Sequence, residues 1–441
     1  MNLTPGRLWG IVNMHTRDLP KPRNHNHAVY PEECHMSHKP LSGVTIIELA
    51  TYAAAPAALR LLADWGAEVI KVEGFDGDPY RRQAPVFNIP LMEDENVSWD
   101  MTSLNKKFIS LNLKHPKGME ALHRLLAKAD VMVTSFRQKA LDKLGLDYGT
   151  LKDKYPRLIM GQMFGYGDKG PEKDTAGYDV TCYVARGGIL GSFHERGTSP
   201  INEPNAFGDY QVALTLAGGI CGALYAREKT GRGDRVITSL FHQSLWAMSV
   251  PIMSSQYGNE YPKSRMEVAN PFNNSYKTSD DRWLIICVPD YDVYYKKMMG
   301  LFGREDLFDD AEINTIGSVL EKSAHRKVIT AIGEAMERKT LKEWLQIFKD
   351  NDVPCEKGAL PKEVLEDPQA WAIDGLRKVQ YPSGNERVIT TTPVRFDSMG
   401  DPDAVIAREL GAETVSILKQ HGYTDAELAE MKADKAVFYP G

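Results

Sequence analysis

Apolar residues from Leu41 onward alternate between strand-like and helix-like spacing. Continuous or alternating apolar runs predict buried strands over 44–50, 68–73, 109–113, 131–136 and 157–164. Helical spacing lies between them, in a segment that opens at Pro56, in one over 119–126 and in one over 141–148. Strands that alternate with helices predict an α/β fold with a Rossmann-like parallel sheet covered on both faces. Ligands of such sheets bind at the carboxyl ends of the strands.

The alternation changes in the middle of the chain. A strand-like run spans 282–288, and amphipathic helices are expected around Tyr294 and Val328. We therefore predict a large Rossmann-like domain over 41–236 and a smaller α+β domain over 237–340.

The first 40 residues have little apolar periodicity and contain five of the eleven histidines. We predict that 1–40 form a flexible extension. Cys34, His35 and His38 have the chemistry of metal ligands, but donors that lie together in a histidine-rich tail more often reflect composition. No metal site is predicted.

Composition excludes several classes of function. The chain has 441 residues, 42% of them apolar, and a net charge of −6, which gives no general attraction to nucleic acid or to an anionic membrane. No apolar stretch is long enough to span a bilayer. The five cysteines are scattered without a C-x-x-C pair, so neither a disulfide framework nor a zinc site is indicated and a cytoplasmic location is expected.

Gly165, Gly167 and Gly170 match the G-x-G-x-x-G pattern of dinucleotide-binding folds. That fingerprint belongs to the first strand-to-helix turn, opens directly into a helix, and requires an acidic residue about 20 residues further on. Here the glycines follow a late strand and are followed by the residues PEKD. We interpret them as a mobile loop.

Asp179 follows this loop and precedes an apolar run. From the local sequence, a helix cap is the more common role for such a residue. A carboxylate nucleophile is the alternative, because an aspartate with an ordinary pKa of about 3.9 is ionised at neutral pH without a helper base.

Six blocks of sequence resemble, in order, the family III CoA-transferases of the formyl-CoA transferase and carnitine CoA-transferase type. The blocks are LSGVTIIELA, LLADWGAEVIKVE, SLNKKFISLNLKHPKG, TSFRQKALDKLGLDY, GYGDKGPEKDTAGYD and GALYAREKTGRGDRVITSLFH. A seventh, NDVPCEKGALPKEVLEDPQA, resembles the C-terminal block of the family. The resemblance covers Leu41 to the end. It implies that 341–441 return to the large domain and that two ring-shaped subunits interlock as a homodimer.

The resemblance implies that Asp179 is the nucleophile and that the substrates are an acyl-CoA thioester and a free carboxylic acid. The reaction would pass through mixed anhydrides and an aspartyl-CoA thioester, without a metal. Gly165, Gly167 and Gly170 would then form a lid whose backbone N–H groups stabilise oxyanions. The residues that match the CoA site of the family, or that supply positive charge for the CoA phosphates, are Asn105, Lys106, Lys107, Phe136, Arg137 and Lys143.

Two departures from the family pattern affect the substrate and the CoA site. The family's Glu-Asn-Phe reads Thr134, Ser135 and Phe136, which puts an Asn-mediated CoA contact in doubt. Residues 52–56 read YAAAP where many members have a Gln-Ala-Gly-Pro-like segment, and no run of several glycines is present, so oxalate and formate are disfavoured.

The block over 227–242 looks most similar to transferases that act on 2-hydroxy acids and their 2-enoyl counterparts, such as aryl-lactates or 2-hydroxyisocaproate. Two alternatives stay open. Acyl-CoA epimerases of the same family pair this aspartate with an upstream histidine, and this chain has none between His123 and His194. An NAD-dependent oxidoreductase is the alternative from another class, and the misplaced glycine pattern weakens it.

Overall fold

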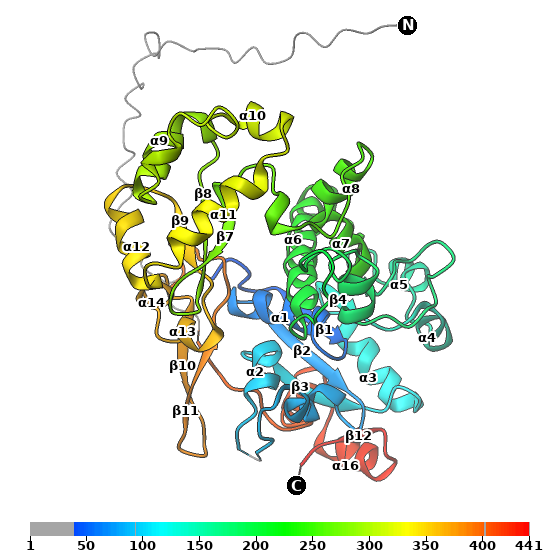
Figure 1. The fold of residues 1–441 in the computed structure, drawn as a ribbon. Coiled ribbons are helices and arrows are strands. Elements are labelled where there is room, and N and C mark those ends of the chain that lie inside the picture. The colour runs from blue at the N-terminus through cyan, green and yellow to red at the C-terminus, as the bar shows by residue number, and fades with distance from the viewer. Residues whose placement is uncertain (1–38, 93, 401–402, 441) are drawn as a thin grey trace, which may run out of the picture. The chain divides into compact units, whose positions relative to one another are not determined.

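The computed structural model describes residues 39–92, 94–400 and 403–440 (Figure 1). The predicted extension, with Cys34, His35 and His38, lies outside this range except for its last two residues. A seven-stranded sheet has the order β12-β3-β2-β1-β4-β5-β6. Its strands are β1 (Thr45–Leu49), β2 (Glu68–Glu73), β3 (Lys107–Leu111), β4 (Val131–Thr134), β5 (Ile159–Phe164), β6 (Arg235–Ser239) and β12 (Val437–Phe438). All pair in parallel except β12, which pairs antiparallel with β3. This sheet confirms the predicted α/β class.

Alternate residues of the central strands point to opposite faces of this sheet, and each face has its own apolar core. Ile46, Val131 and Val133 belong to the core under α1 (Ala54–Asp64) and α6 (Phe207–Thr230). Ile47 and Met132 belong to the other core, which is covered by α3 (Pro116–Leu126), α4 (Gln138–Leu144), α5 (Tyr148–Lys154), α15 (Thr414–Gln420) and α16 (Asp425–Ala433). Burial on both faces explains why the strands read as nearly continuous apolar runs.

The predicted helix over 141–148 is wrong, because the structure has two helices there. Helix α4 ends at Leu144 and α5 begins at Tyr148. Gly145 caps α4 in the left-handed conformation with φ 65°, and the Asp147 side chain accepts a hydrogen bond from the Thr150 N–H at the start of α5. The apolar spacing continues across this break, so periodicity alone did not reveal it.

A second group of elements surrounds the three-stranded antiparallel sheet β7-β8-β9, formed by Asn273–Lys277, Trp283–Cys287 and Cys355–Lys357. Its apolar core is covered mainly by α9 (Tyr291–Leu301), α10 (Ile316–Glu321), α11 (His325–Met336) and α12 (Leu341–Asp350). Strand β8 and helices α9 and α11 lie where the sequence predicts them. Strand β6 spans the predicted boundary at 236/237, and β9 lies beyond residue 340 although it pairs with β8.

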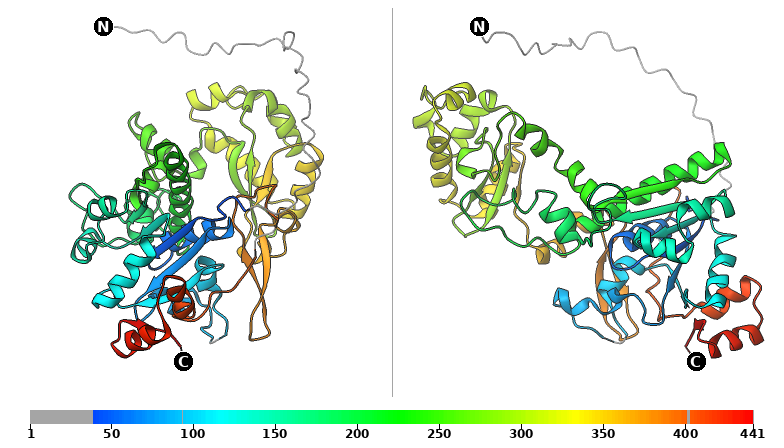
Figure 2. Two further views of the ribbon diagram at one scale, coloured as in Figure 1. Left: turned by 180° about the vertical axis from the view of Figure 1, so that it is seen from behind. Right: turned by 90° about the vertical axis from the view of Figure 1, so that its right-hand side faces the viewer.

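The chain returns to the large sheet at its end. Figure 2 shows the C-terminal segment, in red, beside the blue and cyan part of the chain, in agreement with the β12–β3 pairing. A hairpin of β10 (Leu376–Gln380) and β11 (Glu386–Thr390) precedes this return. Within the described residues, the model has no helix that combines the length and apolarity needed to cross a membrane.

Candidate active site

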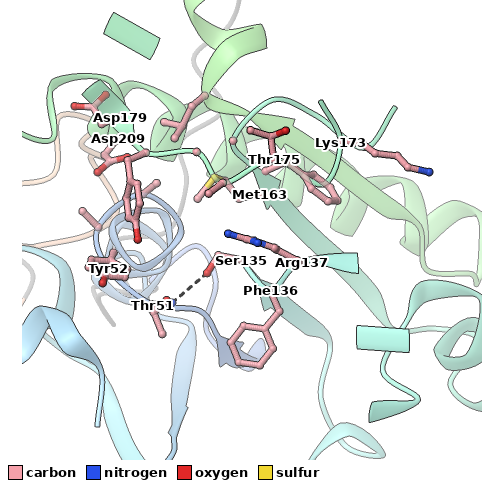
Figure 3. A pocket seen from close by; sticks show the side chains of 18 residues that line it. Thr51, Tyr52, Ser135, Phe136, Arg137, Met163, Lys173, Thr175, Asp179 and Asp209 are labelled. Carbon is pink, nitrogen blue, oxygen red and sulfur yellow. Dashed lines mark hydrogen bonds between the residues drawn. The ribbon is translucent and has the colours of Figure 1, made fainter. Parts of the chain in front are cut away.

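A cavity lies at the point where the order of the strands in the large sheet reverses. Chain order runs outward from β1 through β2 to β3 on one side, and through β4, β5 and β6 on the other. The loops after β1 and β4 therefore diverge at this switch point, where α/β sheets bind their ligands. A cavity of about 250 Å³ lies there (Figure 3). It is lined by residues 51–54, 135–137, 163–165, 173, 175–179, 209 and 240.

Asp179 is the buried carboxylate of this cavity, with a relative exposure of 6%. It opens a π-helical segment, Asp179–Ala185, but it does not cap that segment. Its Oδ1 atom accepts a hydrogen bond of 2.9 Å from the Gly208 N–H in the first turn of α6. Its Oδ2 atom has no hydrogen-bond partner among the described residues. One oxygen of Asp179 therefore caps the distant helix α6, and the other makes no hydrogen bond within the described residues.

Two opposing effects act on the Asp179 carboxyl group. Burial is the larger effect and raises the pKa of Asp179 above its ordinary value, and the backbone N–H groups of residues 206–209 oppose this rise only in part. These groups lie at the N-terminus of a 24-residue helix, whose dipole favours a negative charge. The arrangement shields the carboxylate from water and supports its charge with fixed dipoles, as a nucleophile requires.

Asp209 is a second carboxylate that lines the cavity. Its side chain is partly buried and has no salt-bridge partner among the described residues. Burial, together with the nearby Asp179 charge, raises the pKa of Asp209 to about 7. Neighbouring carboxylates that lack a cation resist ionising together, so Asp209 retains its proton to a higher pH than an ordinary aspartate.

Phe136 and Arg137 line the cavity from the loop after β4, as Figure 3 shows. Arg137 is exposed, and no salt bridge occupies its guanidinium group within the described part of the chain. Ser135, which replaces the family's Asn, accepts a hydrogen bond of 3.1 Å from the Thr51 N–H. It therefore joins the loops after β1 and β4.

The other predicted CoA contacts do not line this cavity. Lys106 stays a predicted CoA contact, but its ammonium group is buried and already pairs with Glu48 Oε2 at 2.7 Å. Asn105 donates 2.6 Å hydrogen bonds to Asp64 Oδ1 and to the Asp403 carbonyl oxygen. Lys107 pairs with Glu68 beside it on β2. Lys143 is exposed on α4.

The predicted lid glycines are separated in the structure. Gly165 directly follows β5 and lines the cavity, where an added Cβ would lie 2.9 Å from the Gly177 Cα. Gly167 and Gly170 have φ angles of 115° and 82° and do not line it. No helix begins directly after this loop, because the next helical segment starts at Asp179. The glycine pattern therefore lacks the setting of a dinucleotide fingerprint.

Several residues of the cavity were not predicted from the sequence, notably Lys173 and Asp209, and Tyr52 had no predicted role. A Gly-Asp pair at the start of a long helical segment was the available signal for Asp209. His123, the histidine considered for epimerase chemistry, lies in α3 and is 3.1 Å from the Tyr155 hydroxyl through Nδ1. It is not a cavity residue.

Comparisons with known proteins show the family of the chain. The chain is 46% identical to cinnamoyl-CoA:phenyllactate CoA-transferase of Clostridium sporogenes, over 90% of this chain and 97% of that protein. It is 41% identical to (R)-2-hydroxy-4-methylpentanoate CoA-transferase of Clostridioides difficile, over 90% and 100%. A crystal structure of a CAIB/BAIF family protein from Brucella suis matches with a TM-score of 0.74 and 27% identity, over 87% and 100% of the two chains. The model of CoA-transferase family III matches residues 41–406, and the chain belongs to that family.

Proposed function

We propose that this CoA-transferase moves CoA from a 2-enoyl-CoA to a 2-hydroxy acid through an aspartyl-CoA intermediate on Asp179. The observation that carries the proposal is the state of this carboxylate. One oxygen is held by the N-terminus of α6, and the other has no partner among the described residues. Such a group combines fixed orientation with a free lone pair, which nucleophilic attack on a thioester requires.

The proposed reaction proceeds in four exchanges at acyl carbons. Asp179 Oδ2 attacks the donor thioester and expels CoA thiolate, which gives a mixed anhydride. The thiolate attacks the aspartyl carbon of that anhydride, releases the donor acid and forms the aspartyl-CoA thioester. The acceptor carboxylate attacks the aspartyl carbon and again expels the thiolate. The thiolate finally attacks the acceptor acyl carbon, which releases the new acyl-CoA and the Asp179 carboxylate.

The CoA moiety is proposed to lie along the loop after β4. Arg137 supplies a planar, exposed cation suited to phosphate oxygens, and Phe136 supplies an apolar surface beside it. Gly165 is the lid residue with the best support, because it alone of the three predicted glycines lines the cavity with Asp179. Lys143 and Lys107 stay predictions at the periphery of the site.

The substrate class rests on the relatives. One acts on cinnamoyl-CoA and phenyllactate, and another on (R)-2-hydroxy-4-methylpentanoate, and both are above 40% identical to this chain. An epimerase is disfavoured because the cavity residues beside Asp179 do not include His123. The family assignment and the misplaced glycine pattern remove the oxidoreductase alternative.

Replacement of Asp179 by Asn tests the mechanism. The amide preserves size but offers no charge, so CoA transfer from cinnamoyl-CoA to phenyllactate should fall more than about a thousandfold while the fold survives. The wild type, given acyl-CoA and then hydroxylamine, should be modified on the peptide that contains Asp179. Asp153→Asn, an exposed change on α5, is the matched control. Retention of a tenth of the transfer by Asp179→Asn, with deamidation excluded by mass, would refute the mechanism.

We also propose the interlocked homodimer and the two-domain organisation. Large apolar side chains are exposed along α7 (Leu240–Ala247), α8 (Ser249–Ser255) and the turn that follows, including Trp246, Val250, Met253 and Tyr257. An apolar patch of this kind supports an interface. The strand pairing supports one adjustment of the domain boundaries, which assigns β9 to the small domain. Mass by light scattering should stay dimeric on dilution, and an active monomer would contradict the interlocked arrangement.

A further inference from the structure

Tyr52 has a strained backbone at the edge of the active-site cavity. It lies in the loop between β1 and α1 with φ 64°, in the left-handed region that non-glycine residues rarely adopt. Such a conformation costs energy and persists only where the surroundings impose it. Its N–H donates a hydrogen bond of 3.1 Å to Asp78 Oδ1.

A buried ionic network restrains both Asp78, the acceptor of this hydrogen bond, and the chain just before Tyr52, its donor. Asp78 Oδ2 pairs with Lys71 Nζ at 2.9 Å, and both side chains are fully buried. Lys71 Nζ also donates 2.7 Å hydrogen bonds to Glu48 Oε1 and to the carbonyl oxygen of Ala50. The network therefore restrains the carbonyl group of Ala50, two residues before Tyr52, as well as the N–H group of Tyr52.

The hydrogen bond from the Thr51 N–H to Ser135 Oγ completes the restraint. Three consecutive residues, 50–52, are thus each tied to a different side chain. A surface loop without a positional role does not require such restraint. The loop instead places one side chain, that of Tyr52, at a defined point of the cavity wall.

The Tyr52 ring contacts the ring of Tyr178, the residue that precedes Asp179. Their centroids lie 5.7 Å apart at an interplanar angle of 84°, an edge-to-face arrangement. Both residues line the cavity, Tyr52 partly buried and Tyr178 55% exposed. Met163 and Leu240 add apolar surface to the same cavity. An aromatic wall, formed by Tyr52 and Tyr178, therefore stands beside the nucleophile.

We propose that Tyr52 is a specificity-determining residue, and that the aromatic wall receives the side chain of the 2-hydroxy acid so that aryl acids are preferred over small alkyl acids. This inference rests on the proposed function. An aromatic substrate ring gains both apolar burial and edge-to-face contact against the tyrosine pair, whereas a methyl group offers less apolar surface and no ring for such contact. The restrained loop supports this preference, because a side chain whose backbone is already fixed loses less entropy on binding.

A competition experiment tests the proposal. The enzyme receives cinnamoyl-CoA as the single donor with equimolar phenyllactate and lactate as acceptors, and the two acyl-CoA products are measured by mass spectrometry. Tyr52→Leu should lower the phenyllactyl-to-lactyl product ratio about tenfold, which corresponds to about 1.4 kcal/mol. Tyr52→Phe, which keeps the ring, should keep the ratio within about twofold of the wild type.

Controls separate recognition of the side chain from other effects. Tyr294→Leu, a change on α9 outside the cavity, should leave the ratio unchanged. Tyr178→Leu should lower the ratio as Tyr52→Leu does, and it provides the test if Tyr52→Leu fails to fold. Thermal melting of each variant shows whether the fold is intact.

The outcomes distinguish this inference from the proposed function. Transfer by Tyr52→Leu with an unchanged ratio would overturn the inference and leave the function intact. Equal loss of both products with a raised KM for acyl-CoA would also overturn it, because Tyr52 would then contact CoA. Absence of any exchange by the wild type would overturn the proposed function itself, and the inference with it.

Discussion

Replacement of Gly208 by Ala adds one methyl group between the nucleophile and the helix that holds it. A Cβ at this position would lie 2.4 Å from Asp179 Oδ1 and 2.2 Å from the Tyr183 Cγ atom. The backbone of Gly208 is outside the left-handed region, so alanine is conformationally acceptable there. The expected effect is therefore steric, at the atoms that orient Asp179.

The size of the effect follows from these distances. An ordinary contact begins at 3.4 Å, so the Asp179 carboxylate or the first turn of α6 must move by about 1 Å. A misplacement of about 1 Å costs roughly a hundredfold in rate. Loss of the 2.9 Å hydrogen bond to a charged acceptor costs about 1.5–3 kcal/mol, or roughly ten- to a hundredfold. The displacement and the lost hydrogen bond are each expected to lower the kcat of Gly208→Ala by about 10- to 100-fold.

The assay measures kcat at saturating cinnamoyl-CoA and phenyllactate, the KM for acyl-CoA, and the thermal melting of the variant. The KM should change little, because Arg137 and Phe136 lie on another loop. Overpacking should lower the free energy of unfolding by about 1–3 kcal/mol. Gly333→Ala on α11 is the matched control, because an added Cβ there meets no atom within 4 Å. A folded Gly208→Ala enzyme with more than half of the wild-type kcat would refute the role assigned to α6.

Three further predictions concern charged groups. Lys106→Ala breaks a buried ion pair with Glu48, so it should lower the free energy of unfolding by about 3 kcal/mol. The KM for acyl-CoA should stay unchanged. A raised KM in a stable variant would contradict this prediction. Arg137→Ala should raise that KM about ten- to a hundredfold, and Arg137→Lys should restore it only in part, because lysine lacks the planar fork; equal values for the two variants would argue against a phosphate contact. The pKa of Asp209 is raised to about 7, above the value of about 3.9 in an unfolded chain. The folded state therefore holds a proton that the unfolded state has released, and wild-type stability falls as the pH rises from about 4 to about 7. The melting temperature of Asp209→Asn relative to wild type should rise between about pH 5 and about pH 8, and a constant difference would show that Asp209 titrates normally.

The sequence by itself determined five strands of the large sheet, the family and, through the family resemblance, the candidate nucleophile. Strands buried on both faces have long apolar runs, so the sequence predicts the limits of β1, β2, β4 and β5 to within about two residues. Ordered blocks between residues 41 and 370 identified the CoA-transferases, a family that the comparisons confirm. The local pattern left Asp179 open between a cap and a nucleophile.

Tertiary structure decided what each charged or aromatic side chain touches. Lys106 directly precedes β3 and Arg137 lies shortly after β4, yet the ammonium group of Lys106 is buried against Glu48, 58 residues earlier, while the guanidinium group of Arg137 lines the cavity. Asp179 caps α6 through Gly208, 29 residues later. Tyr52 receives its backbone restraint from Asp78, 26 residues later on another loop. Local propensity and spacing describe only neighbours in the chain, whereas these contacts form when the parallel strands bring the ends of separate loops together at one edge of the sheet.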